Sequence, residues 1–204
     1  NFFNREIKTL SWIESFEKQS IFIDIGSNIG LFSLYAAYNT NSVISIEPEA
    51  LNFAQLNLNI YDNKFNDKIK AYSIALNNEN SFGYLNISNF NWGKSNHSFE
   101  ISDNKKNYLQ GCSSFTLDYF LNKLKIKPNY IKIDVDGNEI KILEGMKDIL
   151  QIKTLKSILI EVNKNSKNYI LINDLFKKNK FIQVDEEKIE ENIYNIIFKK
   201  LNTE

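Results

Sequence analysis

The chain has 204 residues, 43% of them hydrophobic, which is enough for one well-buried α/β core. Its 25 basic and 25 acidic residues give a formal net charge of zero, and this argues against a partner held mainly through phosphates, such as a nucleic acid. The single cysteine, Cys112, cannot form an internal disulfide. No apolar run approaches the roughly 20 residues that span a bilayer, and no signal-peptide pattern opens the chain. We therefore expect a cytoplasmic protein without a membrane span.

The chain begins with an amphipathic segment at 1–19, where apolar residues recur at helical spacing. Residues 20–25 then form a β-branched and aromatic run typical of a buried strand. Gly26 and Gly30 follow, and a helical pattern begins after the second glycine. Glycine tolerates positive φ and lets backbone N–H groups at a helix N-terminus approach a bound anion. This strand, loop and helix predict a cofactor site.

A second strand is predicted at 42–47, where it ends in Glu47 and is followed by Pro48 at a position suited to the first turn of a helix. Glu47 lies 21 positions after Gly26, the separation at which an acid reaches a ribose in dinucleotide and nucleoside folds. A carboxylate can accept hydrogen bonds from both vicinal hydroxyls, so Glu47 is a candidate ribose ligand. A third strand is predicted at 69–75.

Residues 78–113 are polar and rich in Asn and Ser, with alternation near 82–87 and 98–101 that suggests short strands or a hairpin. Long irregular segments in compact domains are often functional loops, so we expect substrate contacts here. Trp92 could stack on a sugar ring or pin its own loop. His97, the single histidine, has an unperturbed pKa of about 6.5 and is either a candidate base or a solvated side chain.

The second half of the chain alternates strand and helix patterns without an internal repeat or a flexible linker, so we expect a single domain over 1–204. The last two strands are joined by an acidic turn without a helical pattern, which predicts an antiparallel C-terminal hairpin on a seven-stranded, mostly parallel sheet with helices on both faces. Further strands are predicted at 130–135, 157–162, 181–184 and 193–198, and helices at 114–124, 139–146 and 169–177.

Four acids, Asp24, Glu47, Asp134 and Glu161, end predicted core strands. In open α/β sheets ligands bind outside these ends, so the acids should converge. An acidic nucleoside site suits a cofactor with positive charge, and S-adenosylmethionine carries an ammonium and a sulfonium. A nicotinamide dinucleotide normally needs G-x-G-x-x-G, whose middle glycine is Asn28 here. These features favour a methyltransferase over a nucleotide-dependent oxidoreductase or epimerase, which stays the alternative from another class.

Several stretches in order carry a family resemblance: IDIGSNIG at 23–30, Glu47-Pro48, TLD at 116–118 and above all IKIDVDGNE at 131–139. With them the chain resembles the FkbM family of class I S-adenosylmethionine-dependent methyltransferases over about residues 20–162. It departs from the usual pattern at Asp136, where Glu is commoner, and at Asn138, where a small residue is commoner. The resemblance implies a Rossmann-like class I fold and methylation of a hydroxyl oxygen on a saccharide, glycan or secondary metabolite, leaving S-adenosylhomocysteine.

The resemblance also implies roles for residues. Glu139 and Glu161 are candidates to line the acceptor pocket, against capping or pairing with lysines. Asp134, His97 and Glu161 are the candidate catalytic groups, and the base stays open among them. An RNA-modifying enzyme is the alternative among methyltransferases, and the absence of net positive charge argues against it. No metal is predicted. Implied cofactor contacts are Gly26, Ser27, Asn28 and Gly30 at the methionine end, Asp24 near its ammonium, Glu47 with Pro48 at the ribose, Ala75 and Leu76 beside the adenine, and Asp134 facing the methyl.

Overall fold

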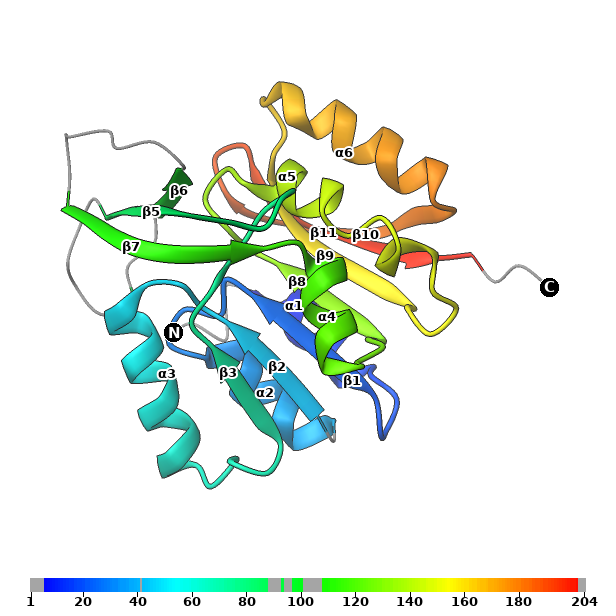
Figure 1. The fold of residues 1–204 in the computed structure, drawn as a ribbon. Helices are drawn as coiled ribbons and strands as arrows, with labels where there is room; N and C mark the ends of the chain where they lie inside the picture. The colour runs from blue at the N-terminus through cyan, green and yellow to red at the C-terminus, as the bar shows by residue number, and fades with distance from the viewer. Residues whose placement is uncertain (1–5, 41, 88–92, 94–96, 101–107, 202–204) are drawn as a thin grey trace.

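The fold is built on a seven-stranded sheet with the strand order β10-β11-β9-β8-β1-β2-β3 (Figure 1). The computed structural model describes residues 6–40, 42–87, 93, 97–100 and 108–201. Strands β3, β2, β1, β8 and β9 run parallel, whereas β11 is antiparallel to both β9 and β10. The predicted sheet and its C-terminal hairpin are confirmed. The strands are β1 Ile21–Ile25, β2 Ser42–Ile46, β3 Ile69–Tyr72, β8 Tyr130–Ile133, β9 Ser157–Asn163, β10 Phe181–Glu190 and β11 Ile193–Lys200.

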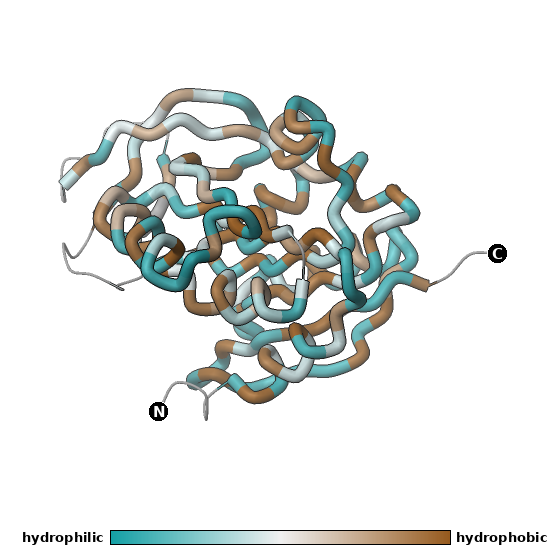
Figure 2. The backbone as a smooth tube through the Cα atoms, turned by 90° about the horizontal axis from the view of Figure 1, so that it is seen from below, coloured by the Kyte–Doolittle hydropathy of each residue, from teal (hydrophilic) through white to brown (hydrophobic). Residues whose placement is uncertain are grey.

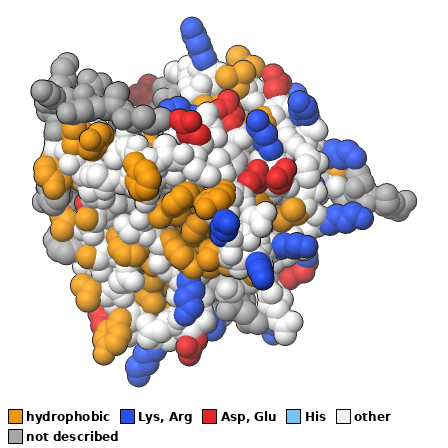
Figure 3. All heavy atoms as spheres, viewed as in Figure 1, with side chains coloured by type: hydrophobic (Ala, Val, Ile, Leu, Met, Phe, Trp, Pro, Cys, Tyr) orange, Lys and Arg blue, Asp and Glu red, His pale blue; other side chains and the backbone are white. Residues whose placement is uncertain are grey.

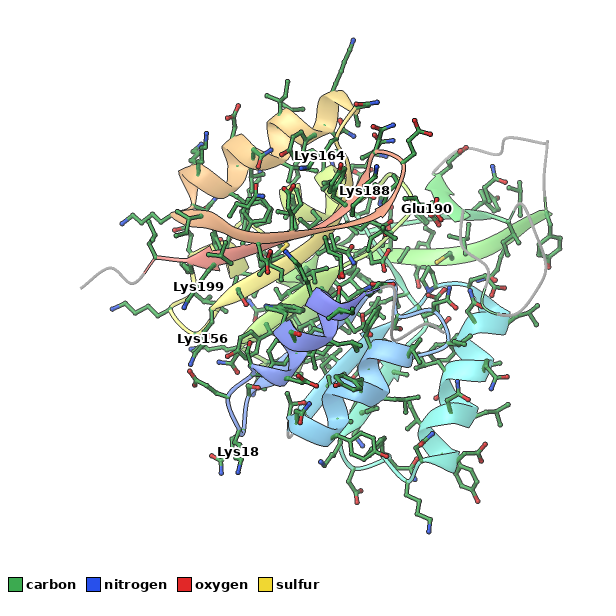
Figure 4. All side chains as sticks on the ribbon, turned by 180° about the vertical axis from the view of Figure 1, so that it is seen from behind. Lys18, Lys156, Lys164, Lys188, Glu190 and Lys199 are labelled. Carbon is green, nitrogen blue, oxygen red and sulfur yellow. The ribbon has the colours of Figure 1, made fainter. Side chains whose placement is uncertain are left out.

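Helices cover both faces of this sheet. Because side chains alternate along a strand, Ile23 and Ile25 of β1 join a core with one group of helices, and Phe22 joins a second core on the opposite face. Figure 4 shows α1 and α2 side by side on the face opposite α6. The first core includes α4 (Leu117–Leu124), α5 (Glu139–Glu144) and α6 (Lys167–Lys178); the second includes α1 (Ile7–Glu14), α2 (Leu31–Asn39) and α3 (Ala50–Asp62).

Capping side chains set where the helices begin. The Glu49 carboxylate accepts the amides of Leu51 and Asn52 and so caps α3. Pro48 therefore lies before the cap, and its predicted place in the first turn is wrong. Thr116 caps α4 through the amide of Tyr119, so the predicted helix at 114–124 begins three residues late, after the end of a strand.

A second, four-stranded sheet has the order β4-β7-β5-β6. The predicted hairpin is confirmed, since β5 (Ser81–Ile87) and β6 (His97–Glu100) pair antiparallel. Strand β7 (Tyr108–Phe115) was not predicted, because most of its residues are only half-buried and its polar and glycine residues show no apolar alternation. The predicted strand at 69–75 is also interrupted: it ends at Tyr72, and β4 (Ala75–Leu76) pairs with β7 instead.

The surface mixes charges of both signs. On the face that Figure 1 presents, hydrophobic side chains gather near the middle and basic and acidic side chains are interspersed around them (Figure 3). Along the backbone, hydrophobic and hydrophilic stretches alternate within most elements (Figure 2), as expected for strands and helices with one buried side. Among the helices described, none is long and apolar enough to cross a membrane.

Candidate active site

The four acids at the predicted strand ends converge at one edge of the sheet. Strands β2, β1, β8 and β9 are successive neighbours that run in the same direction, so their carboxyl ends meet. Asp24 and Glu47 are close enough to interact electrostatically, and so are Asp134 and Glu161. The convergence predicted from the sequence is what the sheet order produces.

Asp24 lies beneath this edge, buried against α2. Its Oδ2 accepts the Ser33 hydroxyl at 2.6 Å, and Ser33 in turn accepts the Ser45 hydroxyl at 2.7 Å. Its Oδ1 is buried without a hydrogen-bond partner among the described residues. Burial raises the pKa of Asp24, while Lys132 and the bond from Ser33 act in the opposite direction. One buried acceptor is therefore left open beside the loop.

The loop after β1 turns on left-handed backbone conformations. Gly26, Asn28 and Gly30 have φ values of +74°, +51° and +91°. A Cβ on Gly26 would stand 1.8 Å from the carbonyl oxygen of Asp134, so the loop and the end of β8 can approach this closely only with glycine here. Asparagine tolerates the left-handed conformation at the middle position, so Asn28 keeps the same backbone path.

Every backbone amide from residue 26 to residue 30 donates to an acceptor inside the protein. The loop amides themselves are therefore already bonded inside the protein, whereas the expectation of an anion at the helix N-terminus concerns the first turn of α2, which begins at Leu31, and stays a prediction. What the loop still presents is the Ser27 hydroxyl, which is buried and has no partner among the described residues. The amides of Gly26 and Ser27 donate to Ile46 O (3.0 and 3.1 Å), Asn28 to Glu47 Oε2 (2.8 Å), Ile29 to Asn28 Oδ1 (2.8 Å) and Gly30 to Ser27 O (2.8 Å).

Glu47 connects this loop to the next helix. Its Oε2 accepts the Asn28 amide at 2.8 Å and its Oε1 accepts the Glu49 amide at 2.9 Å. Burial raises its pKa to about 7, against the effect of these two hydrogen bonds. Each carboxylate oxygen has a further lone pair, so the fixed side chain can still accept hydrogen bonds from a ligand.

Sequence reasoning missed Lys132. Its side chain is 1% exposed, its Nζ lies 2.5 Å from Asp134 Oδ2, and it sits 4.7 Å from the centre of the Phe32 ring. Burial disfavours the charged lysine, but the nearby carboxylates of Asp134 and Asp24 outweigh it and raise the pKa of Lys132. A lysine inside an apolar strand, two positions before an acid and so on the same face, was the available signal.

A cavity of about 400 Å³ adjoins the ends of β8 and β9. Both Glu139 and Glu161, predicted to line an acceptor pocket, line it. Burial, then the Asp134 charge, raises the pKa of Glu161 to about 8, and burial raises that of Glu139 to about 7. Glu139 Oε1 also accepts the Gly137 amide at 2.9 Å, a bond to the turn before α5 and not to an amide of the helix. Other lining residues are Val135, Asp136, Val162, Asn163, Ser166, Asn168, Tyr169, Ile172 and Ile193.

Among the remaining predicted site residues, those that the structure describes lie at the second sheet or beside it. Ala75 and Leu76 are buried in β4, and the Pro48 carbonyl accepts Nε2 of Gln110 at 2.7 Å, which ties the end of β2 to β7. The backbone of His97 pairs with β5; the position of its side chain, and Trp92 altogether, lie outside the described residues.

Comparison with solved structures shows the same fold in methyltransferases. Methyltransferase FkbM from Methylobacillus flagellatus has a TM-score of 0.63 at 14% identity over 90% of this chain. Precorrin-6y C5,15-methyltransferase from Geobacter metallireducens scores 0.59 at 11% identity, covering 96% of this chain and 86% of that chain. An rRNA methylase from Streptococcus thermophilus scores 0.58 at 10% identity, covering 96% and 93%. At these identities the likeness shows the fold.

This chain spans 44% of the length of the Methylobacillus protein. No curated protein sequence matches it. The family model of the methyltransferase FkbM domain matches residues 24–186, from Asp24 in the first strand to β10. With that match over most of its length, the chain belongs to the FkbM methyltransferase family.

Proposed function

We propose that residues 1–204 form one methyltransferase domain that transfers a methyl group from S-adenosylmethionine to a hydroxyl oxygen of a saccharide, glycan or secondary metabolite, leaving S-adenosylhomocysteine. The supporting observation is that the backbone amides of the loop at 26–30 all donate hydrogen bonds inside the protein, and that the Asn28 amide donates to the Glu47 carboxylate. A pyrophosphate is held by free backbone amides of a glycine loop, and the amides of residues 26–30 are already bonded. The loop therefore favours a cationic nucleoside cofactor over a nicotinamide dinucleotide.

The residues of the edge fit such a cofactor. Glu47 has lone pairs for both ribose hydroxyls, and the open oxygen of Asp24 suits an ammonium. The Ser27 hydroxyl, buried without a partner among the described residues, can donate to a carboxylate at the methionine end. We assign Gly26, Asn28 and Gly30 to the same end, because their left-handed backbone shapes the loop that the methionine end of the cofactor would contact. Pro48, Ala75 and Leu76 would border the adenine.

When bound, S-adenosylmethionine supplies an electrophilic methyl group on a positively charged sulfur. Asp134, paired with Lys132 at 2.5 Å, would face that charge from the end of β8. The cavity lined by Glu139 and Glu161 would hold the acceptor, with Trp92 as a stacking partner. Most of the acceleration then comes from aligning the acceptor oxygen with the methyl carbon and the sulfur. Asp134, Glu161 and His97 are the groups assigned to the catalytic site.

The acceptor is proposed to be a small molecule or glycan and not a nucleic acid, because the chain has no net positive charge. A cytoplasmic location fits the free Cys112, which is expected in a reducing compartment.

Calorimetric titration with S-adenosylmethionine, S-adenosylhomocysteine and NAD tests the cofactor. We expect the two adenosyl compounds to bind in the micromolar range and NAD to show no heat of binding. Binding of NAD without the adenosyl compounds would overturn the proposal. Transfer of a labelled methyl group to a panel of sugars, glycans and RNA then tests the acceptor; label appearing on RNA and on no glycan would replace the acceptor class.

A further inference from the structure

Asp134 and Glu161 stand at the same level on neighbouring strands. Ile133 of β8 pairs with Ile160 of β9, so the residues that follow them are neighbours across the sheet. Adjacent strands lie about 4.8 Å apart. On its other side Asp134 adjoins the glycine loop, where its amide donates to Ile25 O at 3.0 Å. The glycine loop, Asp134 and Glu161 therefore follow one another across the carboxyl ends of the neighbouring strands β1, β8 and β9.

Glu161 also borders the acceptor cavity. Glu161 thus lies beside Asp134, which adjoins the proposed cofactor site, and it also lines the cavity proposed for the acceptor. Asp134 is not among the residues that line this cavity. A group that removes a proton from the acceptor must reach the acceptor's oxygen, and Glu161 is placed on that side.

The charges that act on Glu161 come from every element around it. From β8 and the turn after it come Asp134, Asp136 and Lys132, and from the residue before α1 comes Glu6. Its partner in β11, Asn195, donates to Glu6 Oε2 at 3.0 Å. Acids therefore outnumber the cation, and that cation, Lys132, is bonded to Asp134.

No other cation offsets this excess among the described residues. The lysine that follows β9, Lys164, is bonded to Glu186 at 2.8 Å and lies 4.0 Å from the centre of the Tyr194 ring. Figure 4 shows it in the same part of the molecule as Lys188 and Glu190. Burial and the charge of Asp134 accordingly raise the pKa of Glu161 to about 8. In the cofactor-free protein at neutral pH, Glu161 carries a proton.

Resting on the proposed function, we propose that Glu161 takes the proton of the acceptor's hydroxyl group, and that it is ionised only while a cationic cofactor occupies the neighbouring site. Glu161 gains this proton as the acceptor oxygen bonds to the methyl carbon and the methyl–sulfur bond breaks, leaving its electron pair on sulfur. One positive charge disappears from sulfur and one proton arrives on Glu161. The total charge of the buried site stays the same.

The coupling follows from the size of the electrostatic effect. A positive charge within about 4–6 Å lowers the pKa of a carboxyl by about 1 to 3. A sulfonium bound within this distance of Glu161 would lower its pKa from about 8 to between about 7 and 5, so that Glu161 is about half to almost fully ionised at pH 7 and can act as a base. Once the sulfur is neutral, the carboxyl regains its affinity for a proton. The base is thus active with the methyl donor and inactive with the spent product.

Proton release on binding tests this without any acceptor. We would titrate the protein with S-adenosylmethionine and with S-adenosylhomocysteine at pH 7, in two buffers of different ionisation enthalpy. A carboxyl with a pKa of about 8 is about nine-tenths protonated at pH 7. With the pKa of Glu161 lowered from about 8 by about 1 to 3, we expect S-adenosylmethionine to release about 0.4 to 0.9 of a proton more than S-adenosylhomocysteine. Both ligands carry the same amino group, so its contribution largely cancels in the difference.

Two variants assign the proton. Glu161→Gln resembles the protonated carboxyl in shape and charge, so it should fold and bind both ligands, but the difference in proton release should vanish. Glu139→Gln removes the other acid of the cavity and should keep the difference. Equal proton release by the two ligands in the unmodified protein, or loss of the difference in Glu139→Gln instead, would overturn the assignment to Glu161. Failure of both ligands to bind would instead reject the proposed function.

Discussion

The carboxylate of Glu47 accepts the backbone amide of Asn28 at 2.8 Å, and this bond joins the end of β2 to the loop after β1. Its other oxygen accepts the amide of Glu49, the residue that caps α3. One side chain thus holds three segments in register before any ligand arrives. Because the Glu47 side chain is already held in place, it would lose little conformational freedom on binding the ribose as proposed, and this favours affinity.

Replacing this acid tests its proposed contact. In Glu47→Gln the new NH₂ group would face one of two amide donors, and the charge that the ribose hydroxyls meet is lost. Hydrogen bonds to charged groups contribute about 1.5–3 kcal/mol, so we expect S-adenosylmethionine to bind about tenfold to a hundredfold more weakly by calorimetry. The matched control is Asp67→Asn, an exposed acid before β3, which should bind normally. Normal affinity in Glu47→Gln would remove the ribose assignment.

Lys132→Met should destabilise the protein strongly. The change leaves Asp134 and the buried Asp24 without their nearby cation. Removing one partner of a fully buried ion pair costs about 3–5 kcal/mol, because a charge stays behind uncompensated. The Asp134 side chain is 31% exposed, so we expect a loss below this range but well above that of an exposed pair. Urea unfolding measures this loss, and adding Asp134→Asn to Lys132→Met should recover part of it.

The exposed pair of Lys8 and Asp185 supplies the control for this experiment. Its side chains are 47% and 45% exposed, so water already stabilises both charges. Lys8→Met should therefore leave the free energy of unfolding almost unchanged. Equal losses in Lys8→Met and Lys132→Met would contradict the role given to the buried lysine.

Most strands of the large sheet could be predicted because they are short runs of β-branched residues with a polar end, as at 42–47 and 157–162, whereas β10 continues to Glu190 through the acidic stretch that was predicted as a turn. The second sheet was harder to predict. Strand β7 carries Gln110, Gly111 and Ser113 in half-buried positions, and its partners are set by long-range pairing that no local pattern encodes. The same reason explains why Ala75 and Leu76 pair with β7 and do not continue the predicted strand that begins at residue 69.

Within the site, the strand-end acids could be predicted because parallel order brings carboxyl ends together. The burial of Lys132 could not be predicted from a single sequence, since most lysines are solvated and burial depends on what covers the strand. The internal hydrogen bonds of the loop amides could not be predicted for a similar reason. Their acceptors, Ile46 O and the Glu47 carboxylate, belong to another strand, so only the three-dimensional arrangement shows that these amides are already bonded.

The cofactor-free protein should lose stability as pH rises. The pKa values of Glu47, Glu139 and Glu161 are raised from 4.5 to about 7, 7 and 8. Between about pH 4.5 and pH 8 the folded protein holds protons that the unfolded chain has released, so the free energy of unfolding falls with pH. For buried Glu47 the full effect is about 3 kcal/mol. Melting temperatures at pH 5, 6, 7 and 8 measure it, and a constant or rising series would contradict these values.

Gly26→Ala should disrupt the loop. The residue has a φ of +74°, and a Cβ would stand 1.8 Å from the carbonyl oxygen of Asp134. Since backbone atoms cannot give way as a flexible side chain does, the loop after β1 and the end of β8 must separate. We expect a lower melting temperature and at least tenfold weaker binding of S-adenosylmethionine, measured by thermal unfolding and calorimetry.

Gly111→Ala is the matched control, because a Cβ there would meet nothing within 4 Å. Gly111 lies in β7 without a positive φ, so alanine costs no backbone strain and removes some freedom from the unfolded chain. Its melting temperature and cofactor affinity should stay near those of the unmodified protein. If Gly26→Ala behaved like Gly111→Ala, the close approach of the loop to Asp134 would not be needed, and the geometry that brings Asp134 to the proposed cofactor would have to be revised.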